Sequence, residues 1–304
     1  MPAQDLKDHL DKIRSIFDTN KLFRQGIDNQ TIVDYFVESD YGYRVFHSTE
    51  GCLHLALNFD GKFGVEGYYG QARKVQEHIN QIRPVSVLEL GSGKGFNSIY
   101  LAKQNPTTKF VGIDLTPKHV TIARGRARQI ANLRFEIGDF QDLRFCPETF
   151  DLVFAIDTMC YASNVSRALS QASRILKTGG YLSVIDGFRQ AGFNELDSDI
   201  QLAAKLAEVS MAVDHFWMIE NWLEIAQKND FSVLNVEDIS EAILPNLVKL
   251  QHLAKGYFEY PVLSKALLQL LPVNLIKNSI AGLLMPITVR ADAHGYFSIT
   301  LRRS

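Results

Sequence analysis

The distribution of apolar positions divides the 304-residue chain into a central part, where short apolar runs alternate with helical periodicity, and two flanking parts that are mainly helical. In the central part the pattern predicts strands at 85–90, 109–114, 134–138, 151–156 and 181–186, with helices at 95–104, 117–130 and 166–176. Strands that are apolar along their whole length and alternate with helices predict a parallel sheet covered on both faces.

The flanking parts carry helical periodicity before the first central strand and a break in the alternation after the last one. The predicted elements are helices at 4–17, 30–37, 71–81 and 214–229, strands at 231–236 and 295–301, and a mostly helical insertion over 240–292. Residues 41–70 are aromatic and glycine-rich, and they show no periodicity from which a helix or a strand could be predicted. Because no regular crossover helix joins the last two strands, we expect the final strand to run antiparallel.

These elements predict an α/β fold with a doubly wound seven-stranded sheet, whose last strand is antiparallel and to which helical caps are added. We expect an N-terminal helical cap in 1–70, a core in 71–189 and a lid segment in 190–229. The last two strands with their helical insertion then occupy 230–304.

Composition and charge exclude few classes of protein. Apolar residues make up 46% and charged residues 22%, with a formal net charge of -2, as in ordinary globular chains. Nothing in this balance indicates the basic surface of a nucleic-acid-binding protein. Arg124, Arg126 and Arg128 form a local basic group, which is either a patch or a solvated helix face.

The cysteines and the apolar segments indicate in which cellular compartment the protein is expected. Cys52, Cys146 and Cys160 form no CxxC pair, so we expect neither a disulfide framework nor a metal site, and a cytoplasmic setting fits. The first 17 residues lack the apolar run of a secretory signal. Prolines and lysines interrupt 260–287, the most apolar segment, so a membrane span is not expected there.

A glycine-rich turn, ELGSGKG at 89–95, lies between the first central strand and the helix that follows. Glycines let the backbone turn tightly and approach a ligand closely, and a helix N-terminus offers free N–H groups to an anionic group. Such a turn can also be purely structural.

Asp114 ends the second strand, about 20 residues after the glycines. A carboxylate at this point can accept hydrogen bonds from the ribose hydroxyls of an adenosine ligand, although it can also cap the next helix. The two features together favour a nucleoside site. A dinucleotide fingerprint would need glycine at position 96, which is Phe96.

The ExGxGxG pattern resembles the first motif of class I S-adenosylmethionine-dependent methyltransferases. Three further segments are similar to motifs of that family: GDF at 138–140, FDLV at 150–153 and LKTGG at 176–180, where Thr178 replaces the usual proline. The resemblance covers about 71–187 and is nearest to the sterol-, tocopherol- and sugar-type enzymes that methylate small molecules.

The resemblance implies that the core binds S-adenosylmethionine. The cofactor-binding residues that it implies are Tyr69, Glu89, Gly91, Ser92, Gly93, Asp114, Leu115, Asp139, Phe140 and Ile156. In this interpretation the glycines admit the methionine portion, and Glu89 orients the loop and favours the methionine ammonium. Asp114 binds the ribose, while Asp139 and Phe140 contact the adenine.

The segment EGYYG at 66–70 is similar to the region before the core in sterol- and tocopherol-type relatives. Tyrosines there line or close over the cofactor, and aromatic faces suit a sulfonium cation. Packing of the N-terminal segment on the sheet is the alternative for Tyr68 and Tyr69.

A hydroxyl acceptor needs a general base. His215, in the lid segment, is one candidate. Asp157 and Tyr161 are others, because they follow the fourth strand, which faces the transferred methyl group in this family. Further candidates are His47, His54 and Asp186, and for any of the histidines a buried structural role is the alternative. Cys160 is expected to pack in the core.

The helical insertion gives the best indication of the acceptor. Its apolar stripes have three interpretations: the core of a lid, an apolar substrate pocket, or a surface at 260–287 that touches a membrane or another subunit. We expect a polyketide, terpenoid, sterol or lipid-like acceptor, contacted by Tyr68, Phe188 and Trp217. Residues 155–161, AIDTMCY, lack the motifs of nucleic-acid methyltransferases.

The function expected from the sequence is methyl transfer from S-adenosylmethionine to O, N or C of a small, partly apolar molecule. Two alternatives remain: an NAD-dependent oxidoreductase and a non-catalytic cofactor-binding subunit. The acceptor atom and the oligomeric state do not follow from the sequence.

Overall fold

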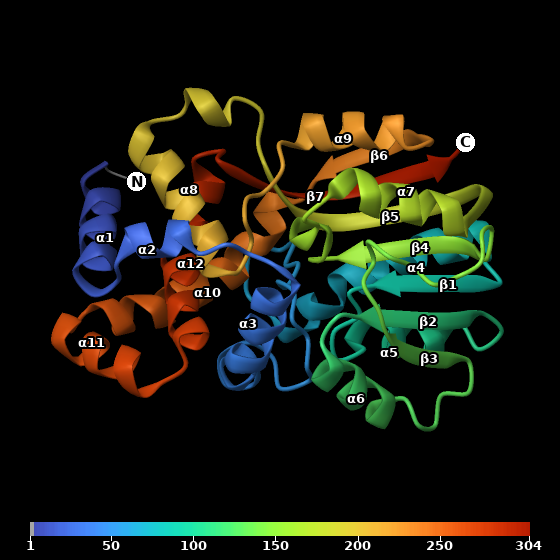
Figure 1. Ribbon diagram of the computed structural model, residues 1–304, viewed down its shortest axis with the longest axis horizontal. Coiled ribbons are helices and arrows are strands. Elements are labelled where there is room, and N and C mark those ends of the chain that lie inside the picture. Colours follow the sequence, from blue (N-terminus) through green and yellow to red (C-terminus); the bar gives the residue numbers. More distant parts are fainter. Residues whose placement is uncertain (1–2) are drawn as a thin grey trace.

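The seven predicted strands form one mixed sheet in the computed structural model, which describes residues 3–304 (Figure 1). The strands are β1 (Ser86–Leu90), β2 (Lys109–Asp114), β3 (Leu133–Ile137), β4 (Phe150–Ile156), β5 (Leu176–Arg189), β6 (Phe231–Asp238) and β7 (His294–Arg303). Their order is β3-β2-β1-β4-β5-β7-β6, and β7 runs antiparallel to both of its neighbours. The predicted fold class is confirmed.

The register of the parallel strands brings their carboxyl ends to one edge of the sheet. Leu90 lies beside Ile113 of β2 and Ala155 of β4, and Ile156 of β4 lies beside Ile185 of β5. The loops that follow β1, β2, β4 and β5 therefore meet, as in other open α/β sheets that bind ligands at this edge.

Helices cover both faces of the sheet. They are α4 (Gly70–Ile82), α5 (Phe96–Gln104) and α6 (Pro117–Arg126) on one face, and α7 (Val165–Ile175) and α9 (Ile219–Lys228) on the other. Successive strand side chains point to opposite faces, so Val87 packs with the first group and Leu88 with the second.

A layer of helices stands beyond the carboxyl ends of the parallel strands (Figure 1). It consists of α1 (Ala3–Ile16), α2 (Thr19–Arg24), α3 (Asn29–Gly42), α8 (Ser198–Ser210), α10 (Ser240–Phe258), α11 (Pro261–Leu270) and α12 (Val273–Arg290). A third apolar core joins these distant segments, with Leu10 and Ile13 of α1 packed in one cluster with Leu206 of α8 and Leu284 of α12. Short helical turns complete the chain: η1 (Tyr43–His47), η2 (Val65–Tyr69), η3 (Met159–Tyr161) and η4 (Phe193–Glu195).

Several element boundaries differ from those expected. The helix before β5 ends at Ile175, and β5 already begins at Leu176, so the glycines at 179–180 lie within the strand. Residues 214–218 are not helical, because the end of β5 holds them through the backbone hydrogen bond from Arg189 to the Trp217 carbonyl. The helical insertion divides into three helices, and prolines mark the starts of the second and third.

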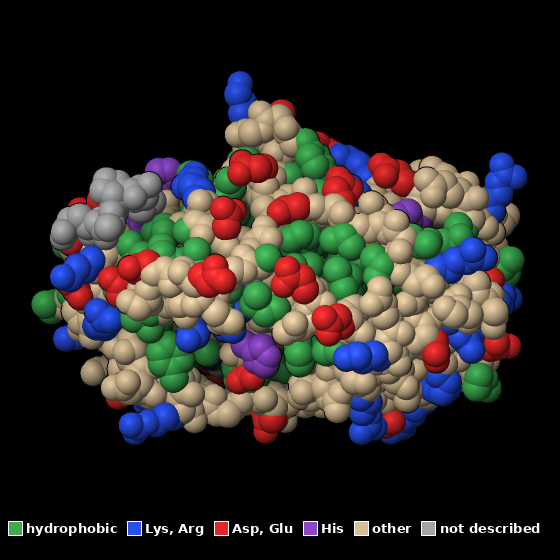
Figure 2. Space-filling view, turned by 90° about the horizontal axis from the view of Figure 1, so that it is seen from above, with side chains coloured by type: hydrophobic (Ala, Val, Ile, Leu, Met, Phe, Trp, Pro, Cys, Tyr) green, Lys and Arg blue, Asp and Glu red, His purple; other side chains and the backbone are tan. Residues whose placement is uncertain are grey.

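The surface seen from above carries acidic and apolar side chains in its middle, and its lysines and arginines form no continuous patch (Figure 2). Over the described range, residues 3–304, no helix combines the length and apolar character that crossing a bilayer requires.

Candidate active site

A cavity of about 620 Å³ lies between the carboxyl ends of the parallel strands and the helical layer. This volume is typical of a pocket for a small molecule. The loops after β1, β2 and β3 line one end, and α3, α10 and α12 line the other. Segments far apart in the sequence therefore line one cavity.

The glycine-rich turn forms the floor of the first end. Gly91, Gly93 and Gly95 have φ values of 63°, 51° and 79°, a region that residues with a Cβ rarely adopt. A Cβ at Gly91 would also collide with the side chain of Thr158. The turn thus requires glycine for both its conformation and its close packing.

Asp114 is fixed beside this turn. One carboxylate oxygen accepts a hydrogen bond from the Gly93 N–H at 2.8 Å, and the other accepts one from the Thr116 N–H at 2.8 Å. Because each carboxylate oxygen has a second lone pair, Asp114 can still accept hydrogen bonds from a ligand in the cavity.

Two buried polar atoms at this end lack a hydrogen-bond partner anywhere in the described part of the chain: Ser92 Oγ and His119 Nε2. Both residues line the cavity, and the His119 Nδ1 lies 3.5 Å from a carboxylate oxygen of Asp114. A buried polar atom without a partner is destabilising by about 1–3 kcal/mol. The pair therefore fits a polar ligand, such as a nucleoside, held between the turn and α6.

Eight of the ten cofactor residues expected from the sequence line the cavity: Gly91, Ser92, Gly93, Asp114, Leu115, Asp139, Phe140 and Ile156. Glu89 lies beneath the turn, where it accepts hydrogen bonds from Asn97 at 3.1 Å and from the Ser98 N–H at 3.2 Å. Burial raises the pKa of Glu89 to about 8. Tyr69 donates to Glu50 and stacks against Phe96, so it is not among the lining residues.

Helix α3, which lines the other end, also reaches this one, and the sequence did not reveal that contact. Asn29 donates to Asp139 at 3.0 Å, and Asp40 pairs with Lys94 of the glycine-rich turn and, at 2.9 Å, with Lys118 of α6. Burial acts to raise the pKa of Asp40, but its two lysine partners hold it below the ordinary value. No local motif marks these α3 residues. His119, in contrast, stands in the first turn of the helix after Asp114, a position from which it could have been inferred.

Two carboxylates meet where β4 and β5 end. Asp157 accepts hydrogen bonds from the Tyr296 hydroxyl at 2.7 Å and the Leu55 N–H at 3.3 Å, and it has a φ of 46°. Burial raises its pKa to about 6. Asp186 accepts three backbone N–H groups, those of Thr158, Cys160 and Gly187. Burial, reinforced by the charge of Asp157, raises the pKa of Asp186 to about 7.

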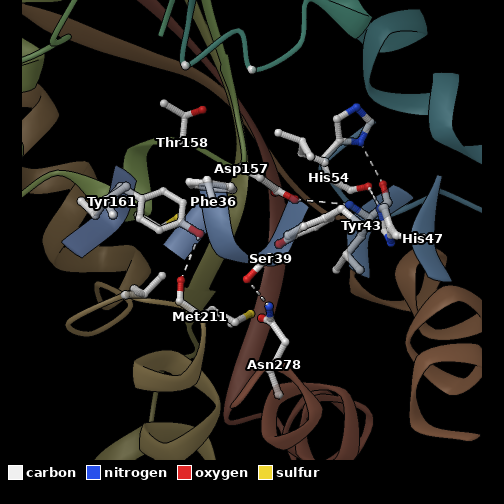
Figure 3. A pocket seen from close by; sticks show the side chains of 18 of the residues that line it. Phe36, Ser39, Tyr43, His47, His54, Asp157, Thr158, Tyr161, Met211 and Asn278 are labelled. Atoms are coloured by element: carbon white, nitrogen blue, oxygen red, sulfur yellow. Dashed lines mark hydrogen bonds between the residues drawn. The ribbon is translucent and has the colours of Figure 1, made fainter. Parts of the chain in front are cut away.

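Aromatic and histidine side chains surround Asp157 (Figure 3). The Tyr161 hydroxyl donates to the Met211 carbonyl at 3.2 Å, and its ring meets Phe36 edge to face, with ring centroids 5.5 Å apart. His47 contacts the His54 carbonyl at 2.8 Å, and burial lowers its pKa to about 4, so it is neutral at pH 7.

Four of the expected catalytic and substrate residues do not line the cavity. His215 has a side chain that is 42% exposed, pairs with Asp214 at 2.8 Å and packs against Trp217. Tyr68 donates to the His47 carbonyl at 2.7 Å, and Phe188 is buried in the sheet core against Trp222. Trp217 also packs on that core. The fold brings none of these four to the space around Asp157.

The second end of the cavity is mainly apolar. Its apolar lining includes Met211, Val213, Phe216, Leu247, Leu250, Leu253, Ala254, Tyr257, Leu267, Leu271, Leu275, Ile276 and Met285. Its polar lining includes Ser39, Tyr43, Asn278 and Ser279. Lys94 is the one lysine or arginine of that lining, and it is already paired with Asp40.

Comparison with known proteins finds a family match for about half of the chain. Residues 83–230 match the family model of a methyltransferase domain. The chain is 32% identical over 130 residues to erythromycin 3''-O-methyltransferase of Saccharopolyspora erythraea, covering 40% of this chain and 42% of that protein. It is 22% identical over 162 residues to methyltransferase GfsG of Streptomyces halstedii, covering 52% and 57%. The chain thus matches about half the length of these curated relatives.

Solved structures extend the likeness to almost the whole chain. The [4+2]-cyclase SpnF superposes with a TM-score of 0.73 at 20% identity, covering 92% of this chain and 99% of that one. Geranyl diphosphate C-methyltransferase from Streptomyces coelicolor A3(2) superposes with a TM-score of 0.65 at 14% identity, covering 89% and 98%. At these identities the likeness shows the shared fold. Residues 83–230 therefore match a methyltransferase domain, and the chain as a whole shares the fold of these solved structures.

Proposed function

We propose that this protein transfers a methyl group from S-adenosylmethionine to an O, N or C atom of a small, largely apolar molecule. The observation that carries the proposal is the single cavity, which joins a polar end built around Asp114 to an apolar end built from the helical insertion. A methyl donor and its acceptor must share one enclosed space, because the transfer is a direct displacement that depends on their alignment.

The polar end would hold the cofactor. Asp114 would accept the ribose hydroxyls, Asp139 would face the adenine, and the unpartnered Ser92 and His119 would gain hydrogen bonds. Glu89 would act from below by holding Asn97 and the start of α5. When bound, S-adenosylmethionine supplies an electrophilic methyl group on a sulfonium.

The apolar end would hold the acceptor. Since the described lining contains no unpaired lysine or arginine, it favours a neutral or weakly polar molecule over a phosphate. Two relatives are named erythromycin 3''-O-methyltransferase and fatty-acid O-methyltransferase, and these names support a polyketide or lipid-like acceptor. Tyr43 and Tyr161 would contact its polar group near the point of reaction.

Asp157 is the general base that we propose for a hydroxyl acceptor. It lines the cavity, and a carboxyl group with a pKa near 6 is largely ionised at pH 7 yet basic enough to take a proton. Asp157 would take the hydroxyl proton of the acceptor as the new oxygen–methyl bond replaces the sulfur–methyl bond of the donor, whose sulfur would keep the electron pair of that bond. His215 is half-exposed and lies outside the cavity lining, so we do not retain it as the base.

The cofactor assignment is tested by calorimetry with S-adenosylmethionine and, separately, with NADH. We expect micromolar binding of S-adenosylmethionine alone, lost in Asp114→Ala. Binding of NADH alone would instead support the oxidoreductase, and binding of neither would support the non-catalytic subunit.

Methyl transfer itself is then measured with radiolabelled S-adenosylmethionine and a panel of fatty acids, macrolides and quinols. This second step matters because SpnF, which shares the fold, is named as a cyclase. Cofactor binding without transfer to any member of the panel would contradict the proposed acceptor class.

A further inference from the structure

Helix α11 and the segments beside it expose an apolar surface. Seven large apolar side chains within residues 253–273 are exposed: Leu253, Tyr260, Val262, Leu263, Leu270, Leu271 and Val273. Val262 is 85% exposed and Leu270 78%, whereas Ser264 is the buried residue of α11. A surface helix normally buries its apolar face, and single exposed apolar residues are ordinary, but a cluster of this size marks an interaction site.

This surface is continuous with the mouth of the cavity. Leu253 and Leu271 are both exposed and part of the cavity lining. Tyr41 and Phe46, from α3 and η1, are likewise 58% and 50% exposed and line the same cavity. We call these two residues and the seven of 253–273 the mouth patch. Helix α11 forms the outer edge of the helical layer, so the patch lies at the periphery of the molecule (Figure 1).

The segment that carries seven of the nine patch residues, 253–273, has two lysines, Lys255 and Lys265, and one acidic residue, Glu259, whereas the protein as a whole is slightly acidic. Both lysines are exposed. A surface that is both apolar and positively charged complements an anionic lipid interface.

We propose that the mouth patch docks on an anionic lipid surface, and that the acceptor passes between this lipid phase and the cavity through the mouth. The route of the acceptor rests on the proposed function, whereas the docking does not. A second copy of the chain is a poorer occupant, because a symmetric contact would place the lysine-flanked segments of the two copies against each other. An apolar acceptor that leaves a lipid layer directly into this mouth avoids exposure to water.

Sedimentation with lipid vesicles tests the docking without any knowledge of the acceptor. Vesicles of phosphatidylcholine and phosphatidylglycerol in equal parts are compared with vesicles of phosphatidylcholine alone. We expect the full chain to partition at least about tenfold more strongly onto the anionic vesicles, and less so as salt rises. Lys255→Gln combined with Lys265→Gln should reduce this preference.

The patch itself is tested by the triple variant Val262→Ser, Leu263→Ser and Leu270→Ser. All three side chains are exposed, so the substitutions spare the core, and binding to anionic vesicles should fall about tenfold. The matched control is Leu234→Ser with Val236→Ser, two exposed apolar residues of β6, which should bind as the unmodified chain does.

Four results would overturn the proposal. They are no binding of the unmodified chain, undiminished binding of the triple serine variant, equal binding to both kinds of vesicle, and self-association in light scattering that the triple variant abolishes. Calorimetry with S-adenosylmethionine on the same samples separates the two ideas. Lost docking with intact cofactor binding contradicts the docking alone, and docking without cofactor binding contradicts the proposed function alone.

Discussion

The hydrogen bond from Tyr296 to Asp157 should set the protonation state of the proposed base. The hydroxyl and carboxylate oxygens are 2.7 Å apart, and both groups are buried. A hydrogen bond to a charged group stabilises it by about 1.5–3 kcal/mol, and one pKa unit corresponds to about 1.4 kcal/mol. Tyr296→Phe should therefore raise the pKa of Asp157 by about 1–2 units, so that about half or more of it is protonated at pH 7.

The substitution removes one atom and leaves the ring in place. The Gln71 amide keeps its hydrogen bond to the Leu55 carbonyl at 2.6 Å. Its second N–H loses the Tyr296 hydroxyl, which accepts it at 3.2 Å in the unmodified chain. Asp157→Asn identifies the carboxyl signal of Asp157 in carbon-13 spectra of aspartate-labelled protein. This signal is then followed as a function of pH in the unmodified chain and in Tyr296→Phe.

Other groups that face Asp157 are Asp186, Cys160, Tyr161, Tyr43 and Cys52. Asp186→Asn removes a negative neighbour and should shift the pKa of Asp157 downward, opposite to Tyr296→Phe. Tyr181→Phe, which changes a tyrosine of β5 that lies beside Leu152 of β4, should leave the pKa of Asp157 unchanged. An unchanged or lowered pKa in Tyr296→Phe would refute the reasoning, and so would equal shifts in both tyrosine variants.

Four further outcomes are expected. Asp114→Ala should weaken S-adenosylmethionine binding by at least about tenfold in calorimetry, because each charge-assisted hydrogen bond contributes about 1.5–3 kcal/mol; unchanged affinity would contradict the ribose role. Asp40→Asn should lower the free energy of unfolding by about 3 kcal/mol in urea, since it leaves the buried Lys94 without its counter-charge; a change below the error of measurement would argue against the pair. Burial raises the pKa of Glu89 to about 8. The contribution of this group to the free energy of unfolding is therefore complete below the unfolded pKa near 4.5, and it is lost as pH rises from there through 8. Glu89→Gln should accordingly become more stable relative to the unmodified chain as pH rises over this range, and a constant difference would exclude that shift. His215→Ala should leave turnover within about twofold, because the side chain is exposed and lies outside the cavity lining, and a large loss would restore it as a catalytic candidate.

The sequence determined the sheet and the polar end of the cavity, because both follow from short-range patterns. Apolar runs of five or six residues specify buried parallel strands, and the turn at 89–95 needs glycine wherever the chain folds this way. Asp114 and Asp139 follow strands whose carboxyl ends must meet in a parallel sheet. Local spacing was therefore enough to place most of the expected cofactor residues in one cavity.

Only the tertiary structure decided which distant segments complete the site. The Tyr296 hydroxyl reaches Asp157 across 139 positions, and Asn29 reaches Asp139 across 110, yet neither pair leaves a local pattern. The placement of His215 outside the cavity is of the same kind. Hydrophobic periodicity shows that a helix has an apolar face, but it does not show what packs against that face. From the sequence, the apolar face of α11 could therefore belong to the core of a lid, to a substrate pocket or to an exposed surface. The packing of the helical layer shows that it is exposed.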